Sequence, residues 1–220
     1  MRLFKFKPNI NWKYVFGEIF LIFVGINLAI WFNNWNASKR IRQAKKVAIE
    51  KIAEEIKSNR YDLDTSYQNA TLILNAMKDI KRLYWNTSST VKATPSQMRD
   101  FQQQYPRYFR VQDSTRFDST LFLYQGKTFI ELELIELTQI AWETTKNIDL
   151  LNSLNYECLY QLESMYNLQK RVQKEVDKAG EALQKGQFDD LTRILAFLLQ
   201  LEEQLAEEYT EMLKNIVDCR

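Results

Sequence analysis

The most continuous hydrophobic stretch of the chain lies close to its N-terminus. Residues 14–32, YVFGEIFLIFVGINLAIWF, are apolar except for Glu18 and Asn27. About 20 residues at 1.5 Å each are needed to cross the hydrocarbon core of a bilayer, and this stretch approaches that length. Aromatic residues suited to the two membrane interfaces stand at its edges. They are Trp12, Tyr14, Trp31 and Trp35. The pattern predicts a transmembrane helix.

A cleaved signal peptide is the alternative interpretation, since it too begins with basic residues. The apolar core of a signal peptide, however, spans only about 7–15 residues. The sequence NNWN at 33–36 provides no cleavage site of the small-x-small type. We therefore predict that the segment is retained as an anchor.

Two polar residues inside the apolar stretch need an explanation. Glu18 lies one turn into the span, where it can reach the headgroups and where the helix dipole favours a carboxylate. The alternative is a helix–helix contact, because small residues let a second helix approach closely. At about 100° per residue, Glu18, Ile22, Gly25 and Ala29 form one stripe, and Asn27 faces the opposite side. These five residues are the predicted contacts to other transmembrane helices.

A heptad pattern begins at Ile49. One seam position holds Ile49, Ile56, Leu63, Ala70, Met77 and Tyr84, and the other holds Ile52, Asn59, Ser66, Ile73 and Ile80. No Gly or Pro occurs between Gly25 and Pro95, so we predict that the helix continues to about Trp85. The polar residues Asn59 and Ser66 either set the register of packing or face water, and we expect water.

The middle of the chain is less regular. Thr94, Pro95 and Gln97 match a capping box with proline at the first helical position, which predicts a short helix ending before Pro106. Residues 106–119 have no clean period, and we expect a loop packed on the bundle, with a contact surface as the alternative. Residues 121–130 could form a hairpin around Gln125-Gly126, although we expect helices there.

Two further apolar patterns predict the closing helices. One runs from Asn155 to about Ala179, and the other starts at a capping Asp189 or Asp190 and includes Ile216; Gly180 and Gly186 flank the hinge between them. The predicted fold is all-α, with the transmembrane helix continuing into a long helix that packs with the C-terminal helices as an elongated antiparallel helical bundle. The expected parts are a basic tail (1–13), the transmembrane helix (14–32), a basic juxtamembrane helix (33–48) and a helical soluble domain (49–220).

Charge is distributed unevenly along the chain. Residues 1–46 contain nine basic residues and one acidic residue, a formal charge of +8, and the remainder is −6. Cationic flanks suit anionic lipid headgroups. The acidic soluble part argues against nucleic acid as a partner. Both flanks of the span are basic, and we expect the N-terminus in the cytoplasm and the large domain on the other side.

The sequence offers little catalytic chemistry. The chain has no histidine, and its two cysteines, Cys158 and Cys219, lack metal-ligand spacing. We expect two free thiols, with a disulfide as the alternative. The acid pairs at 54–55, 202–203 and 207–208 are expected on solvated faces, as are Glu131, Glu133 and Glu136. Trp142 is expected to be buried beside a partly exposed Glu143. We predict no catalysis, no cofactor, no metal and no small-molecule substrate.

The N-terminal residues carry a family resemblance. Gly17-Glu18-Ile19, Gly25-Ile26, Ala29 and the NNWN at 33–36 resemble the signature of an uncharacterised family of single-pass inner-membrane proteins of Bacteroidota. Residues 141–146, AWETTK, resemble a segment that contains WE in the same family. The resemblance covers residues 14–36 well and the middle of the soluble domain loosely. It departs from the family pattern at Asn27, at Trp31 and at Asn147-Ile148-Asp149. It implies a bacterial inner membrane and no activity. With the orientation expected from the flanking charges, the soluble domain would lie in the periplasm.

Two functional hypotheses follow. The first is a membrane-anchored interaction or scaffold protein, whose partners are the lipid bilayer and, through the transmembrane helix, a homo-oligomer or another membrane protein. The alternative is a small accessory subunit of a transport or ion-coupled complex that uses Glu18 inside the membrane. An extracytoplasmic sensor is a third hypothesis, but such a protein would need a second span and a cytoplasmic output domain.

Overall fold

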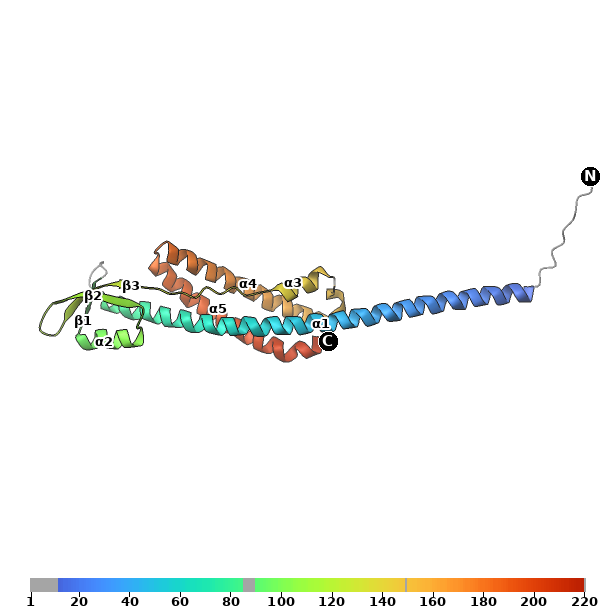
Figure 1. Ribbon diagram of the computed structural model, residues 1–220, viewed down its shortest axis with the longest axis horizontal. Helices are drawn as coiled ribbons and strands as arrows, with labels where there is room; N and C mark the ends of the chain where they lie inside the picture. The colour runs from blue at the N-terminus through green and yellow to red at the C-terminus, as the bar shows by residue number, and fades with distance from the viewer. Residues whose placement is uncertain (1–11, 85–89, 149, 220) are drawn as a thin grey trace, which may run out of the picture. The chain divides into compact units, whose positions relative to one another are not determined.

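The computed structural model describes residues 12–84, 90–148 and 150–219. Its elements in chain order are α1 (Trp12–Leu83), β1 (Thr90–Ala93), α2 (Pro95–Gln104), β2 (Phe109–Arg116), β3 (Phe122–Thr128), α3 (Ile140–Asn147), η1 (Leu151–Ser153), α4 (Tyr156–Gln184), α5 (Phe188–Asn215) and η2 (Ile216–Cys219) (Figure 1). The chain divides into two compact units, Met1–Val47 and Ala48–Arg220, and α1 runs through the boundary. Residues 1–11 of the predicted basic tail lie outside the described residues, whereas Trp12 and Lys13 already belong to α1. The expected end of the long helix at Trp85 also lies outside them, and the described part of α1 ends at Leu83.

The heptad seam of α1 is the centre of the Ala48–Arg220 unit, as the periodicity predicted. Its apolar members from Ile49 to Ile80 are buried, whereas Tyr84, the last residue of the predicted seam, is exposed. The expectation that Asn59 and Ser66 face water was wrong, because these side chains are only 1% and 2% exposed. Both are hydrogen-bonded to segments far away in sequence, so their burial is compensated.

The helical packing differs from the predicted antiparallel bundle in one respect: α4 runs parallel to α1. Tyr166 of α4 bonds Glu55 of α1, and Gln169, further along α4, bonds Asn59, further along α1. A parallel neighbour requires a long crossover. The chain supplies it as an extended segment, residues 129–139, which runs back along α1 before α3. We call this the return segment.

The last helix, α5, is antiparallel to both α1 and α4, as predicted. Asp189 near its start bonds Lys81, and Glu202 further along bonds Ser66, which comes earlier in α1. Gly186 makes the sharp turn between α4 and α5 with φ of +66°, a conformation that favours glycine. The predicted cap was wrong: Gln187 occupies the N-cap without a side-chain bond, and Asp189 lies in the first turn.

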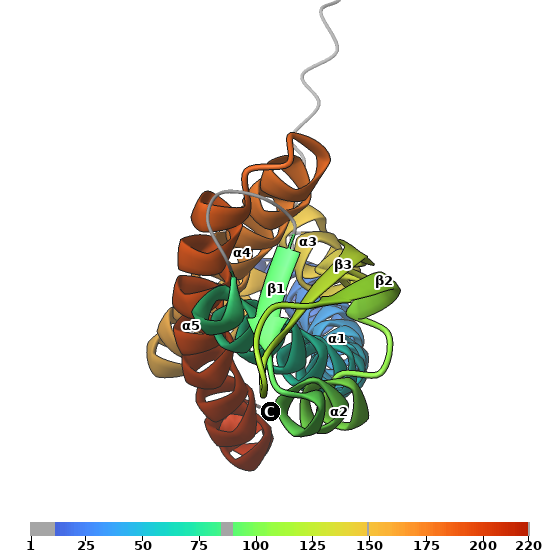
Figure 2. The same cartoon turned by 90° about the vertical axis from the view of Figure 1, so that its left-hand side faces the viewer.

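A three-stranded antiparallel sheet, in the order β1–β3–β2, corrects the all-α prediction. Figure 2 shows the sheet and α2 beside the C-terminal end of α1. The hairpin turns at 117–121, so Gln125-Gly126 lies within β3 and not at a turn. A Cβ at Gly126 would overlap the ring of Phe109 and the Arg110 carbonyl oxygen, so this close approach needs glycine. The strands were missed because most of β2 is exposed and lacks an apolar alternation.

Local signals at two helix starts were accurate. Thr94 and Gln97 form the reciprocal capping box ahead of α2, which ends before Pro106 as expected. Asn155 caps α4 by accepting a hydrogen bond from the Cys158 amide. The helix runs five residues beyond the expected end at Ala179, to Gln184.

Cys158 and Cys219 form a disulfide, which corrects the expectation of two free thiols. Because α4 and α5 are antiparallel, the beginning of α4 lies beside the end of α5, and the two cysteines meet there. Asn155 adds a hydrogen bond from its Nδ2 to the Asp218 carbonyl oxygen, 3.1 Å away. The link fixes the C-terminal end of the described chain to α4.

Candidate functional site

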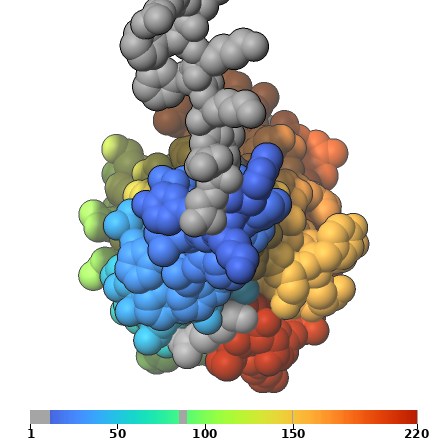
Figure 3. Space-filling view, turned by 90° about the vertical axis from the view of Figure 1, so that its right-hand side faces the viewer, coloured from blue at the N-terminus to red at the C-terminus, as the bar shows by residue number. Residues whose placement is uncertain are grey.

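The first part of α1 presents apolar side chains on every side. All four predicted interfacial residues, Trp12, Tyr14, Trp31 and Trp35, are exposed. In the apolar window of α1, none of the residues is buried within the structure (blue in Figure 3). A core helix of a water-soluble protein would bury much of such a surface. Among the described residues, α1 is the one helix that is long and apolar enough to cross a membrane.

The predicted contact stripe lies on this exposed part of α1. Glu18, Ile22, Gly25 and Ala29 are all exposed, and a Cβ at Gly25 would meet no atom of the chain within 4 Å. Asn27 Nδ2 donates to the Phe23 carbonyl oxygen at 2.7 Å, one turn earlier in the same helix. This bond satisfies part of the amide within the helix and so lowers the cost of placing it in lipid.

A polar network lies on the buried side of α1 and holds the return segment. Asn59 accepts from the Thr138 amide at 2.9 Å and donates to the Thr138 carbonyl oxygen at 2.7 Å. Asn69 likewise donates to the Glu131 carbonyl oxygen and accepts from the Glu133 amide. These side-chain amides replace a neighbouring strand, because each satisfies one donor and one acceptor of the extended main chain.

Gln173 of α4 supplies a third pairing of this kind. It donates to the Ile135 carbonyl oxygen and accepts from the Leu137 amide. The return segment is therefore held from α1 and from α4. As predicted, the side chains of Glu131, Glu133 and Glu136 are exposed.

Glu55 fastens the beginning of α3. Its two oxygens accept from the Ala141 amide at 2.8 Å and from the Tyr166 hydroxyl at 2.7 Å. Trp142, buried as expected, stacks on Tyr166 with ring centroids 5.4 Å apart. Burial raises the pKa of the Tyr166 hydroxyl far above its usual range, so it stays protonated and donates to Glu55. The carboxylate is satisfied on both oxygens, and we assign it a structural role.

The hydrogen bonding of Glu202 is less complete than that of Glu55. Ser66 Oγ donates to Glu202 Oε1 at 2.7 Å, but the buried Oε2 of Glu202 has no hydrogen-bond partner. Glu202 is 1% exposed, and burial raises the pKa of its carboxyl to about 7. A buried carboxylate oxygen without a donor is costly. This is the most perturbed carboxyl in the described part of the chain.

Glu202 lies on the wall of a groove between α1 and α5 with a volume of about 780 Å³. We call it the α1–α5 groove; α1 contributes residues between 60 and 67, and α5 contributes residues between 202 and 215. Carboxylates outnumber cations on its walls. The acids are Asp64, Glu202, Glu203, Glu207 and Glu211, and the cations are Arg60 and Lys214. The lining of the groove therefore has a negative formal charge and is suited to a cationic ligand.

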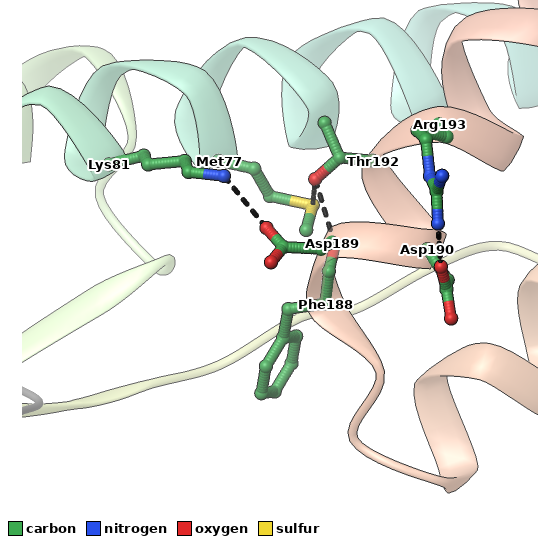
Figure 4. Close-up of polar contacts among 7 residues, drawn as sticks. All are labelled: Met77, Lys81, Phe188, Asp189, Asp190, Thr192 and Arg193. Carbon is green, nitrogen blue, oxygen red and sulfur yellow. Dashed lines mark hydrogen bonds and ion pairs between the residues drawn. The ribbon is translucent and has the colours of Figure 1, made fainter. Parts of the chain in front are cut away.

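A second polar cluster joins α1 to the first turn of α5 (Figure 4). Lys81 Nζ lies 2.7 Å from Asp189 Oδ1, and Thr192 Oγ1 donates to the Phe188 carbonyl oxygen at 2.8 Å. The hydrogen bond from Lys81 lowers the pKa of the Asp189 carboxyl. Both charged side chains are largely exposed, so the pair contributes little to stability. The cluster positions a helix start and has no unsatisfied group that calls for a ligand.

Sequence reasoning missed both buried acids, Glu55 and Glu202, which were expected on solvated faces. A signal for Glu202 was present. Buried residues of α5 recur at spacings of four and three from Leu191 to Ile216, and position 202 continues that repeat. Glu203 is exposed, as expected. The described residues contain no group of three or more His, Cys, Asp or Glu side chains placed to hold a metal ion.

Comparison with family models, with curated proteins and with solved structures finds no match for this chain. The resemblance of residues 14–36 to a family of bacterial membrane proteins therefore stays a prediction.

Proposed function

We propose that this protein is a single-pass, membrane-anchored helical interaction or scaffold protein without catalytic activity, resident in a bacterial inner membrane. The observation that carries the proposal is the exposure of the whole apolar window of α1, none of which is buried. The same helix continues into the Ala48–Arg220 unit, so the apolar segment and the folded unit are joined by one element. A bilayer is the environment in which such a surface is stable.

The disulfide supports a periplasmic position for the soluble unit. Disulfides persist in oxidising compartments, including the bacterial periplasm, and are rare in the cytosol. The Cys158–Cys219 link agrees with an orientation that places the N-terminus inside and the large unit outside. The positive-inside rule alone is ambiguous here, because both flanks of the apolar segment are basic.

An interaction role, rather than catalysis, is supported by the chemistry of the buried polar groups. Asn59, Asn69 and Gln173 bond the main chain of the return segment, and Glu55 bonds an amide and a hydroxyl. These groups build the fold. We propose that oligomers or partner complexes form through Glu18, Gly25 and Ala29, where small residues permit close helix contact.

Membrane fractionation tests the anchor. Full-length protein should remain in the membrane pellet after extraction with alkaline carbonate. Leu21→Arg together with Val24→Arg should release it, because each arginine at mid-span costs about 2.5–3.5 kcal/mol. Tyr61→Arg is the matched control, since Tyr61 is an exposed residue of the same helix within the soluble unit. Wild-type protein found in the aqueous fraction, or lacking its first three dozen residues, would refute the proposal.

Glu18 motivates a second candidate function, an accessory subunit of an ion-coupled complex. It is the one acidic residue of the apolar segment, and ionisable groups inside membranes are often functional. Glu18→Gln separates the two functions. A scaffold should keep its crosslinked assembly and its cellular phenotype, whereas an ion-coupled subunit should assemble normally and lose function.

A further inference from the structure

The α1–α5 groove contains an unsatisfied acceptor that the fold itself does not explain. Ser66 uses one oxygen of Glu202, and no donor within the described residues reaches the other. By contrast, both carboxylate oxygens of Glu55 and the amide oxygen of Asn59 have donors. A cationic N–H group at Glu202 would supply the missing hydrogen bond and the missing countercharge together.

The charge around Glu202 favours such a cation. Glu203, Glu207 and Glu211 line the groove at four-residue intervals, about 6 Å apart along the helix axis. Elsewhere in the unit, acids such as Glu54 and Glu175 are paired with a lysine one turn away on the same helix. No ion pair is formed by the groove acids within the described part of the chain.

The spacing of the carboxylates and the apolar lining of the groove fit a peptide better than a compact ion. Alternate residues of an extended chain lie about 6.6–6.8 Å apart, close to the spacing of the carboxylates on α5. Leu63 and Ala206 also line the groove and offer apolar surface to the aliphatic stems of lysine or arginine. A row of basic side chains could thus contact successive carboxylates while one of them reaches Glu202.

We propose that the α1–α5 groove binds a lysine- or arginine-rich segment of a partner protein, with one cationic side chain bonded to Glu202. This inference rests on the proposed function as an interaction protein and names the chemistry of its partner. Arg60 on α1 and Lys214 on α5 also line the groove, and they would disfavour basic residues beside them. Because the two helices are antiparallel, both cations lie toward the end of the groove away from the Ser66–Glu202 pair. The carboxylates nearer Glu202 define the stretch that the basic segment occupies.

The test uses the full chain in nanodiscs of phosphatidylcholine, whose headgroups carry no net charge. The probe is fluorescein-labelled acetyl-(Lys-Ala)4-amide, and fluorescence anisotropy reports its binding. Glu202→Gln should weaken binding about tenfold or more, as expected for loss of a charge-assisted hydrogen bond. Glu203→Gln with Glu207→Gln should also weaken it, and this pair changes only exposed side chains. Glu163→Gln, an exposed acid of α4 outside the groove, is the matched control and should leave affinity within twofold.

A pH series gives an independent readout. Because the Glu202 carboxyl must ionise to bind a cation, wild-type affinity should rise several-fold from pH 6 to pH 8. The other charged or titratable groups of the groove are Arg60, Asp64 and Tyr67 on α1 and Glu203, Glu207, Glu211 and Lys214 on α5. Glu202→Gln keeps all of them, so it should remove this rise if Glu202 is responsible. Retention of the rise in Glu202→Gln would overturn its assignment.

Several outcomes overturn the proposal as a whole. The first is equal affinity of wild type and all variants for the lysine probe, and the second is absence of any binding of that probe. The third is binding of the acidic peptide acetyl-(Glu-Ala)4-amide with the same affinity as the lysine probe. Displacement of the peptide by spermidine at lower concentration than unlabelled peptide would assign the groove to a small polyamine instead. A nanodisc mass that corresponds to two copies of the chain bound to each other would assign the groove to a second copy of this protein. Carbonate extraction is measured without the peptide probe, so the proposal of a membrane anchor and the proposal of a peptide-binding groove can be refuted independently.

Discussion

The disulfide between Cys158 and Cys219 provides a prediction whose magnitude follows from the chain topology. The cysteines are 61 residues apart, and their link restricts the unfolded chain. In the chain-entropy model, a closed loop of this length contributes about 4 kcal/mol to the free energy of unfolding. Replacing both cysteines with alanine should therefore lower the melting temperature by roughly 8–16 °C for a domain of this size.

Circular dichroism of the full chain in mild detergent measures the effect. Wild-type protein treated with reductant should melt close to the double variant, because both lack the same constraint. The single variant Cys158→Ala should match the double variant, since one cysteine alone cannot form the link. Disulfide formation should also depend on export, because the bond needs an oxidising compartment.

Labelling of free cysteines can refute this reasoning. Cells can be lysed in the presence of a thiol-blocking maleimide and the protein examined for labelled cysteines. If both cysteines of the membrane-bound protein are labelled without reduction, the disulfide is absent, and the argument for a periplasmic unit fails. If the bond is present but reductant leaves the melting temperature unchanged, the entropic magnitude is wrong.

Three further predictions concern the interior of the Ala48–Arg220 unit, each measured by urea or thermal unfolding of the full chain in detergent. Glu202 has a folded pKa of about 7 against an ordinary 4.5, so the folded state holds its proton more tightly and stability falls as pH rises between these values. Glu202→Gln should be more stable than wild type by about 3 kcal/mol at pH 8 and equal to it near pH 4; a pH-independent difference would contradict this. Asn59→Ala should cost about 2–4 kcal/mol, because it removes the partners of the Thr138 main chain and of the buried Gln169 and leaves a cavity at a buried position. The exposed Gln68→Ala should cost less than about 0.5 kcal/mol, and equal effects would exclude the proposed role. Gly126→Ala should cost about 1–3 kcal/mol because its Cβ overlaps Phe109, and an unchanged melting curve would show that the sheet yields there.

The long helix and the start of α2 were predictable because their signals are local. The seam from Ile49 to Ile80 repeats without a helix breaker, and the capping box of Thr94 and Gln97 involves residues three apart. The burial of Asn59 and Ser66 was not predictable in this way. Their partners at Thr138 and Glu202 are 79 and 136 residues away. In a single sequence, a polar seam residue with a distant partner looks the same as one that faces water.

The sheet and the direction of α4 were missed for a related reason. β2 is polar and exposed over most of its length, so its pairing with β3 depends on main-chain bonds that leave little mark on the side-chain pattern. Residues 129–139 carry leucines and acids that suit a surface helix equally well. Their extended form depends on amides supplied by Asn59, Asn69 and Gln173, and that long return path is what lets α4 run parallel to α1. The candidate groove depends on which of Glu202 and Glu203 faces inward, which the heptad of α5 decides.

The pairing of the return segment with side-chain amides makes its length a fixed quantity. Asn69, Gln173 and Asn59 each meet set main-chain positions between 131 and 138. Removing or adding one residue there would put a carbonyl where an amide is required, and the leucines would change sides. Connections between elements ordinarily absorb insertions and deletions. In this domain, insertions and deletions should instead fall at the hairpin tip, 117–121. The return segment keeps a constant length and thereby sets the residue at which α3 begins.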